Sequence, residues 1–264
     1  MSVLDGVTWR GHDVYLGEDR MEMTKLVETP GSVVHKARLR DCAVVVKRFK
    51  HPESIEYETE LRIIARTKQE SALARLFVAA CPTNRSSIVM EACDGDLSAL
   101  NWSACSAADI RTALRRLCQD LQIMVSCNVY YTDLKLQNVV FKRSNGGVTY
   151  KWGDFSSVAS HNWSTQTYPY PTPTYDFRDY DNTFMPACER VLVWGLGIMW
   201  CQMLGHERLC VEYLCFNRLT RRSLRAFKFA LFKHKHTPPA LRNILELKVH
   251  TLHEFLDSTS RGDT

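Results

Sequence analysis

The sequence predicts an α+β fold of two lobes, a β-rich first lobe with one helix and a mainly helical second lobe. Short apolar runs bounded by turn residues occupy residues 24–92, as expected for antiparallel strands, and helical periodicity dominates from residue 107 onwards. A length of 264 residues suits one large domain. We expect a single domain over 1–264, with the first lobe at about 1–91, a connector at about 92–96 and the second lobe at about 97–264.

In the first lobe we expect strands at 25–27, 33–37, 43–47 and 87–92, a helix at 53–67 and a turn at 94–96. In the second lobe we expect helices at 107–125 and 191–205 and a hairpin with strands at 139–142 and 148–152. The stretch 156–187, which contains four prolines, is expected to be a long irregular loop. Loops of that length inside a compact domain are usually functional.

Composition narrows the class of protein. The chain has 34 Lys and Arg residues against 29 Asp and Glu residues, a net charge of +5, and 45% of its residues are hydrophobic. These values are ordinary for a globular protein and exclude a disordered, coiled-coil or collagen-like chain. The mild excess of positive charge disfavours a nucleic-acid partner.

The lack of a recognisable signal peptide or membrane span predicts a protein that works inside the cell, in the cytoplasm or the nucleus. The first residues lack the basic and apolar regions of a signal peptide. The longest apolar run, 191–205, is shorter than the ~18 residues of a membrane span, so we expect a buried helix and no membrane contact. The ten cysteines include no C-x-x-C pair, and several lie in apolar surroundings, as Cys42 does, which predicts reduced thiols in the core.

Four polar side chains in the middle of the chain form the most informative pattern. Asp133, Lys135 and Asn138 lie within one predicted loop, and Asp154 follows a predicted strand 21 residues after Asp133. Carboxylate and amide oxygens are ligands that Mg²⁺ prefers, a carboxylate can accept a hydroxyl proton, and an amine can stabilise a transferring phosphoryl group. The pattern therefore suits phosphoryl transfer.

On these residues the chain resembles the eukaryotic protein kinases, whose motifs are well defined. The run DLKLQN at 133–138 matches the D-L-K-x-x-N core of the catalytic loop, and DFS at 154–156 stands where that family has D-F-G. VVK at 45–47 matches the end of the V-A-I-K strand, and LVWGLGI at 192–198 resembles the start of the buried central helix. The order of these motifs makes the resemblance strong over residues 26–205.

The resemblance implies catalytic roles. Asp133 would orient or deprotonate the substrate hydroxyl, and Lys135 would stabilise the transferring phosphoryl group. Asn138 and Asp154 would hold Mg²⁺. A lysine two residues after the catalytic aspartate resembles the pattern of the Ser/Thr kinases rather than that of the tyrosine kinases.

The resemblance also implies an ATP site. Lys47 would hold the phosphates and would be positioned by Glu60, with Glu56 and Glu58 as alternative partners. IVME at 88–91 resembles the hinge between the lobes, with Met90 at the pocket wall. The residues expected at the nucleotide are Lys47, Glu60, Gly31, Val34, Val45, Met90, Glu91 and Asp96.

One departure from the family concerns the phosphate-binding loop. Its three glycines would fall on Val27, Thr29 and Ser32, and only Gly31 remains, displaced by one position. A loop with fewer glycines approaches phosphate less easily with its backbone, so we expect weakened ATP binding.

Other departures lie in the second half of the chain. Thr132 replaces the catalytic-loop arginine, which predicts that activation does not require a phosphorylated activation loop. Ser156 replaces the D-F-G glycine and is expected to stiffen that hinge, and Leu192 replaces the central-helix aspartate. The best candidate for the A-P-E element is 172–174.

Such eroded motifs in a compact chain suggest a fast-evolving kinase, such as one from a large DNA virus.

Positive charge is concentrated in one segment. Residues 217–242 contain eight basic residues and no acidic one, and the rest of the chain has a net charge of −3. Apolar residues at helical spacing predict an amphipathic helix here with a basic outer face. This face is either merely solvated or docks an acidic protein or RNA.

These observations favour a protein kinase that uses ATP and Mg²⁺ to phosphorylate Ser or Thr in protein substrates. The alternative is a pseudokinase that acts as an ATP-binding or protein-binding scaffold, which the degenerate glycine loop, Ser156 and Leu192 support. A small-molecule kinase of the aminoglycoside-phosphotransferase type is a weaker alternative, because Lys135 and the WGLG helix disfavour it.

Overall fold

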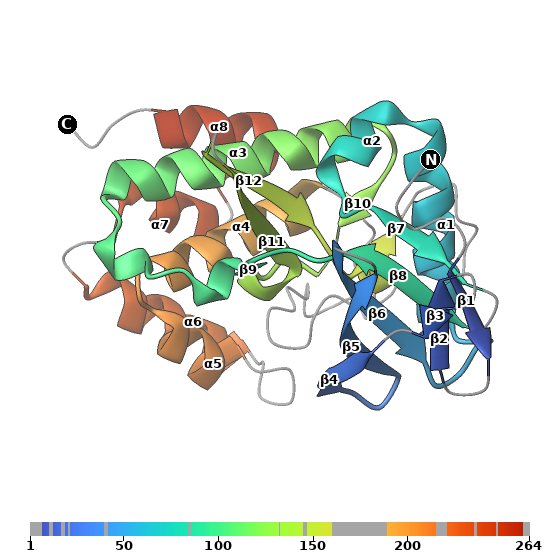
Figure 1. Cartoon of the computed structure of the whole chain (residues 1–264). Coiled ribbons are helices and arrows are strands. Elements are labelled where there is room, and N and C mark those ends of the chain that lie inside the picture. Colours follow the sequence, from blue (N-terminus) through green and yellow to red (C-terminus); the bar gives the residue numbers. More distant parts are fainter. Residues whose placement is uncertain are drawn as a thin grey trace. The chain divides into compact units, whose positions relative to one another are not determined.

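The computed structural model confirms the predicted two-lobed α+β fold (Figure 1). It describes residues 7–10, 13–16, 19–20, 22–39, 42–83, 86–131, 133–144, 147–159, 189–214, 221–234, 237–246 and 248–260. By its internal packing the chain forms two compact units, Met1–Asp96 with Val139–Ser156 and Leu97–Asn138 with Ser157–Thr264. The hairpin after residue 139 thus belongs with the sheets of the first unit, although its place in the sequence groups it with the helices.

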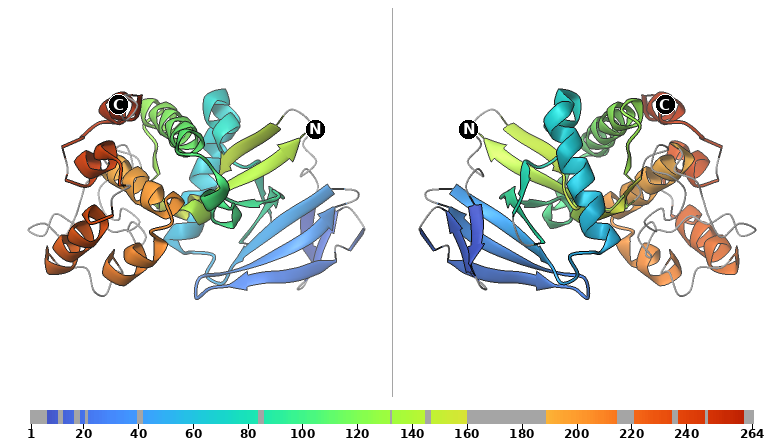
Figure 2. Two further views of the ribbon diagram at one scale, coloured as in Figure 1. Left: turned by 90° about the vertical axis from the view of Figure 1, so that its left-hand side faces the viewer. Right: turned by 90° about the vertical axis from the view of Figure 1, so that its right-hand side faces the viewer.

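The first unit is built on a five-stranded antiparallel sheet of order β4-β5-β6-β8-β7. Its strands are β4 (Met23–Glu28), β5 (Ser32–Leu39), β6 (Cys42–Phe49), β7 (Ala80–Pro82) and β8 (Ser87–Glu91). The blue strands of Figure 2 show β4, β5 and β6 side by side. All of these strands except β7 match predicted runs. The sequence did not reveal β7, because it is three residues long and ends in a proline.

Two smaller sheets and two helices complete the first unit. One sheet contains β1 (Val7–Arg10), β2 (Asp13–Leu16) and β3 (Asp19–Arg20), and the other contains β9 (Gly95–Asp96), β11 (Val139–Ser144) and β12 (Gly147–Trp152). The helices are α1 (Ile55–Gln69) and the short α2 (Ser71–Leu76). Helix α1 begins at Ser54, whose side chain accepts a hydrogen bond from the Tyr57 backbone N–H, as a Ser N-cap does.

The second unit is helical, as predicted. Its helices are α3 (Ala107–Ser126), α4 (Glu189–Met203), α5 (Glu207–Leu214), α6 (Arg221–Phe232), α7 (Pro239–Leu245) and α8 (Leu252–Ser260). Two short strands, β10 (Tyr130–Tyr131) and β13 (Val158–Ala159), pair with each other. Helix α4 contacts α3, α5, α7 and α8, and every residue from 191 to 203 is buried, which makes it the core of the unit.

Two local expectations were wrong. The turn expected at 94–96 is in part strand β9, because Gly95 and Asp96 pair with β11. Cys42, expected in the core, is exposed at the start of β6, whereas Cys118, Cys201 and Cys210 are buried. In the described part of the chain no helix combines the length and the apolarity that crossing a membrane requires.

Candidate active site

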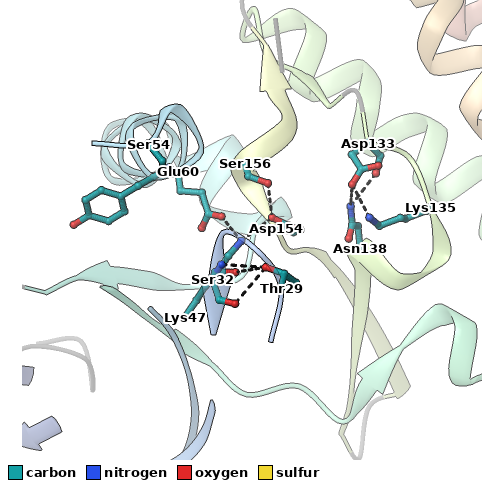
Figure 3. Close-up of polar contacts among 11 residues, drawn as sticks. Thr29, Ser32, Lys47, Ser54, Glu60, Asp133, Lys135, Asn138, Asp154 and Ser156 are labelled. Atoms are coloured by element: carbon teal, nitrogen blue, oxygen red, sulfur yellow. Dashed lines mark hydrogen bonds and ion pairs between the residues drawn. The ribbon is translucent and has the colours of Figure 1, made fainter. Parts of the chain in front are cut away.

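Lys47 is the centre of a cluster of charged groups in the first unit, in which Lys47 and Glu60 are buried and Asp154 is partly exposed (Figure 3). It lies near the end of β6, and its Nζ is 2.5 Å from Glu60 Oε1 on α1 and 2.9 Å from Asp154 Oδ1. Of the two alternative glutamates on α1, Glu58 instead pairs with Arg62. The helix therefore presents Glu60 to the lysine, as the predicted spacing requires.

Burial and the neighbouring charges both shift the pKa values of Lys47 and Glu60. Burial lowers the pKa of Lys47, but the carboxylates of Glu60 and Asp154 outweigh it and hold that pKa above its ordinary value. The lysine is therefore a stable cation at neutral pH. Burial raises the pKa of Glu60 to about 7 in spite of Lys47, and the nearby Asp154 carboxylate adds to that rise.

The register of the sheet places the apolar nucleotide candidates beside Lys47. Lys47 pairs with Val34 on one side and with Ile88 on the other, and Val45 pairs with Met90. Residues that lie opposite each other point to the same face of a sheet, as do residues two apart along one strand. Lys47, Val45, Val34 and Met90 thus share one face, which suits an apolar adenine ring next to a phosphate-binding cation.

The turn between β4 and β5 stands where the family has its glycine loop, and two of its own residues are hydrogen-bonded to each other. Thr29 N donates to Ser32 O at 2.8 Å, and Ser32 N donates to Thr29 Oγ1 at 3.0 Å (Figure 3). An added Cβ at Gly31 would meet no atom within 4 Å, so the turn itself does not need a glycine there. The backbone N–H of Ser32 is already bonded, which reduces the donors that this turn can offer to a phosphate.

Asp133 forms a second polar cluster, in the second unit (Figure 3). Its Oδ2 accepts hydrogen bonds from Lys135 Nζ and Asn138 Nδ2, both at 2.8 Å, and the Asn138 amide also donates to the Asp133 backbone carbonyl. Asp133 and Asn138 are buried. These bonds hold the carboxylate, the amine and the amide of the predicted catalytic loop together.

Close packing of α4 supports this loop. An added Cβ at Gly195 would lie 2.6 Å from Cδ1 of Leu134, the neighbour of Asp133. Only glycine allows this approach. Leu192, which replaces the family's central-helix aspartate, is fully buried in the same helix, so it adds packing and no polar brace.

Asp154 is fixed by its own neighbours. Its backbone has a φ of +49°, in the left-handed region that non-glycine residues seldom adopt. Its Oδ1 accepts a 2.7 Å hydrogen bond from Ser156 Oγ, and Phe155 packs edge-on against Phe77 with ring centroids 5.1 Å apart. Strained backbone of this kind is concentrated at functional sites.

The remaining hinge candidates have structural partners. Glu91 accepts hydrogen bonds from the Ala79 backbone N–H at 2.9 Å and from Lys151, and it lies 3.8 Å from Lys142. It therefore ties β8 to the β11–β12 hairpin. Asp96 lies in β9 and pairs with β11.

Asn138 and Asp154, the expected Mg²⁺ ligands, belong to different compact units. Each offers the hard oxygen that this ion prefers. Because the Asn138 amide nitrogen is bonded to Asp133, its carbonyl oxygen is the atom that can serve as a ligand. No group of three or more His, Cys, Asp or Glu residues in the described ranges could hold a metal ion.

The sequence analysis missed some residues of this site and named others that lie outside the described residues. The bonds of Thr29 and Ser32 to each other, and the ties of Glu91 to Lys142 and Lys151, were not foreseen. The Thr-Pro-Gly-Ser run was a usable signal for the first, since Thr and Ser hydroxyls bond locally in turns. Thr132, and the A-P-E candidate 172–174, fall outside the described residues.

The two-lobed fold and the family match place the chain among the kinases, a class of phosphotransferases. The sequence matches the family model of the protein kinase domain over residues 29–258, so the chain belongs to the protein kinase family. Membership implies protein substrates and the use of ATP, typically with Mg²⁺. A comparison with curated proteins finds no match.

Proposed function

We propose that this protein is a catalytically competent Ser/Thr kinase that requires Mg²⁺ and ATP. The observation that carries the proposal is the bonding of buried Lys47 to both Glu60 and Asp154. Burying a cation beside two carboxylates costs desolvation free energy, and ionisable groups kept in such surroundings are concentrated at functional sites. A triphosphate supplies the anion that such a cation attracts, and family membership makes ATP the expected source.

The chain's own residues divide the remaining work. Lys47 binds the phosphates, and the Val34, Val45 and Met90 face accepts the base. Asp133 accepts the proton of the attacking hydroxyl, and Lys135, bonded to the same carboxylate, balances charge on the transferring group. Mg²⁺, when bound, neutralises charge on the phosphate oxygens.

Asn138 and Asp154 would hold the Mg²⁺ ion. Specificity for Ser and Thr rests on Lys135, whose position two residues after Asp133 resembles that of the Ser/Thr kinases. An intracellular location, in the cytoplasm or the nucleus, is part of the same proposal, because ATP and Mg²⁺ are supplied there.

A scaffold without catalysis is the second candidate. The self-bonded turn at Thr29 and Ser32 favours it, since that turn offers fewer backbone donors to phosphate than a glycine loop does. Weak nucleotide binding with no transfer is the behaviour that this alternative expects.

Transfer from radiolabelled ATP to one basic and one acidic protein, followed by phosphoamino-acid analysis, tests the proposal. The Asp133→Asn variant, prepared identically, shows whether a contaminating kinase supplies the signal. We expect labelled phosphoserine or phosphothreonine with the wild type and none with the variant. Label on tyrosine would contradict the Ser/Thr assignment. Equal label with the wild-type and the Asp133→Asn enzymes, or no label with either enzyme, would contradict catalysis by this site.

A further inference from the structure

An exposed stripe along helix α6 and the first residue after it combines cations with an aromatic ring. Arg222, Arg225, Phe229 and Lys233 are all exposed and follow one another at spacings of three, four and four residues. Residues at such spacings lie on one face of a helix. The stripe, defined here as these four residues, is about 17 Å long at ~1.5 Å per residue.

The opposite face of α6 belongs to the core. Phe227 and Leu231 are fully buried there, and α6 packs against α5 (Figure 1). The stripe is thus separate from the side chains that hold the helix in place, and its substitution should not unfold the protein.

Phe229 is the unusual member of the stripe, since 65% of its surface is exposed. The Lys233 ammonium lies over its ring, 4.1 Å from the centroid. Among the described residues, no acidic side chain pairs with Arg222 or Arg225. An exposed aromatic ring flanked by cations is typical of a protein-binding surface, because aromatic and arginine side chains supply most of the binding energy at interfaces.

We propose that this stripe binds an acidic protein segment that also carries an apolar side chain. Glutamates or aspartates would pair with Arg222, Arg225 and Lys233, and the apolar side chain would cover the open part of the Phe229 ring. The chain's excess of positive charge comes from this segment, because the residues outside 217–242 have a net charge of −3. Complementary charge therefore selects an acidic partner for this helix.

A protein fits the stripe better than RNA does. The stripe has a single aromatic ring, with Lys233 over one of its faces, whereas single-stranded nucleic acid is usually bound by several aromatic side chains on which successive bases stack. Three cations on a single helix face also provide few phosphate contacts compared with an extended basic groove.

Peptide binding to the full chain, without nucleotide, tests the proposal independently of catalysis. The probe is a fluorescent peptide with glutamates three and four residues apart and one central leucine. Its two comparison probes are the same peptide with serine for leucine and a single-stranded RNA of similar length. We expect binding of the leucine peptide, with the serine peptide and the RNA each weaker by about fivefold or more.

Substitutions then locate the site. Arg222→Glu with Arg225→Glu should abolish peptide binding, and Phe229→Ser should weaken it by about fivefold or more. The matched control, Lys68→Glu with Arg75→Glu, makes the same change in net charge at exposed positions of the first unit and should leave binding unchanged. A thermal melt of each variant confirms folding.

Three outcomes would overturn the proposal. They are tighter binding of the RNA than of the leucine peptide, equal binding of the leucine and serine peptides, and an equal loss of binding in the control and the stripe variants. Absence of peptide binding by the folded wild type would overturn it as well. None of these results depends on phosphoryl transfer, so they leave the proposed function to its own test.

Discussion

Ser156 Oγ donates a 2.7 Å hydrogen bond to Asp154 Oδ1, the same oxygen that accepts the hydrogen bond from Lys47 Nζ. The serine that replaces the family's glycine therefore orients the expected metal ligand. It is a positioning residue, because it acts through Asp154.

Removing this hydroxyl should weaken the response to Mg²⁺. For Ser156→Ala we expect the Mg²⁺ concentration for half-maximal activity to rise about tenfold, since a mispositioned ligand commonly loses that much affinity. Ser156→Thr, which keeps the hydroxyl, should restore the wild-type value. A titration of transfer rate against Mg²⁺ measures both. If alanine and threonine variants responded alike, the hydroxyl would have no positioning role.

Lys47 should contribute to stability as well as to ATP binding. Lys47→Met leaves the carboxylates of Glu60 and Asp154 without their buried cation, which we expect to lower the free energy of unfolding by about 3 kcal/mol. Adding Glu60→Leu should recover most of that loss, because one buried carboxylate is removed. Denaturant unfolding measures stability and calorimetry measures ATP binding, which should be lost in both variants. Retained ATP affinity in the double variant would show that Lys47 does not bind the phosphates.

The Glu60 carboxyl gives stability a pH dependence. Its pKa is about 7 in the folded protein against an ordinary value of 4.5, so the folded state binds the proton more tightly. The stability that the folded state gains from binding this proton on Glu60 is fully present below pH 4.5 and is lost as pH rises through about 7. From about pH 5 to about pH 8, wild-type stability should fall relative to Glu60→Gln, by an amount on the order of 3 kcal/mol.

Thermal unfolding of the wild type and Glu60→Gln across that pH range measures the difference. The glutamine variant is the suitable comparison because its amide oxygen can still accept the bond from Lys47. Parallel stability curves would show that Glu60 titrates near its ordinary value.

Substitutions at two glycines of α4 allow the effect of packing on stability to be measured apart from its effect on catalysis. An added Cβ would lie 2.6 Å from Leu134 at position 195 and 2.7 Å from Ile244 at position 197, so Gly195→Ala and Gly197→Ala should each cost about 1–3 kcal/mol. Only the first displaces Leu134, beside Asp133. We expect kcat to fall about tenfold or more for Gly195→Ala and to change little for Gly197→Ala. Equal effects on kcat would mean that the close approach to Leu134 serves stability alone.

The sequence predicted most of the elements, because their signals are local. The strands around Lys47 and the helix that carries Glu60 follow from alternation and from 3.6-residue periodicity. The grouping of the β11–β12 hairpin with the first unit did not follow, since it rests on contacts such as the isolated bridge between Phe77 and Trp152, 75 positions apart in the chain. The bonds within the turn at Thr29 and Ser32 depend on side-chain geometry that spacing does not reveal.

The candidate site was predicted from motifs, and the structure adds what holds it together. Spacing indicated Glu60 but left Glu56 and Glu58 open, and the structure pairs Lys47 with Glu60. The role of Ser156 was predicted as a stiff hinge, whereas the structure shows its hydroxyl donating a hydrogen bond to Asp154, the expected metal ligand.

The central claim is that Asp133 acts on the reacting hydroxyl while nucleotide binding rests on Lys47. The most direct test compares Asp133→Asn with Gln137→Ala, a matched control at an exposed position of the same loop. Single-turnover transfer and ATP affinity are measured for both. We expect Asp133→Asn to lower the transfer rate by about 100-fold or more with unchanged ATP affinity, and Gln137→Ala to match the wild type. A transfer rate for Asp133→Asn equal to that of Gln137→Ala would contradict the account.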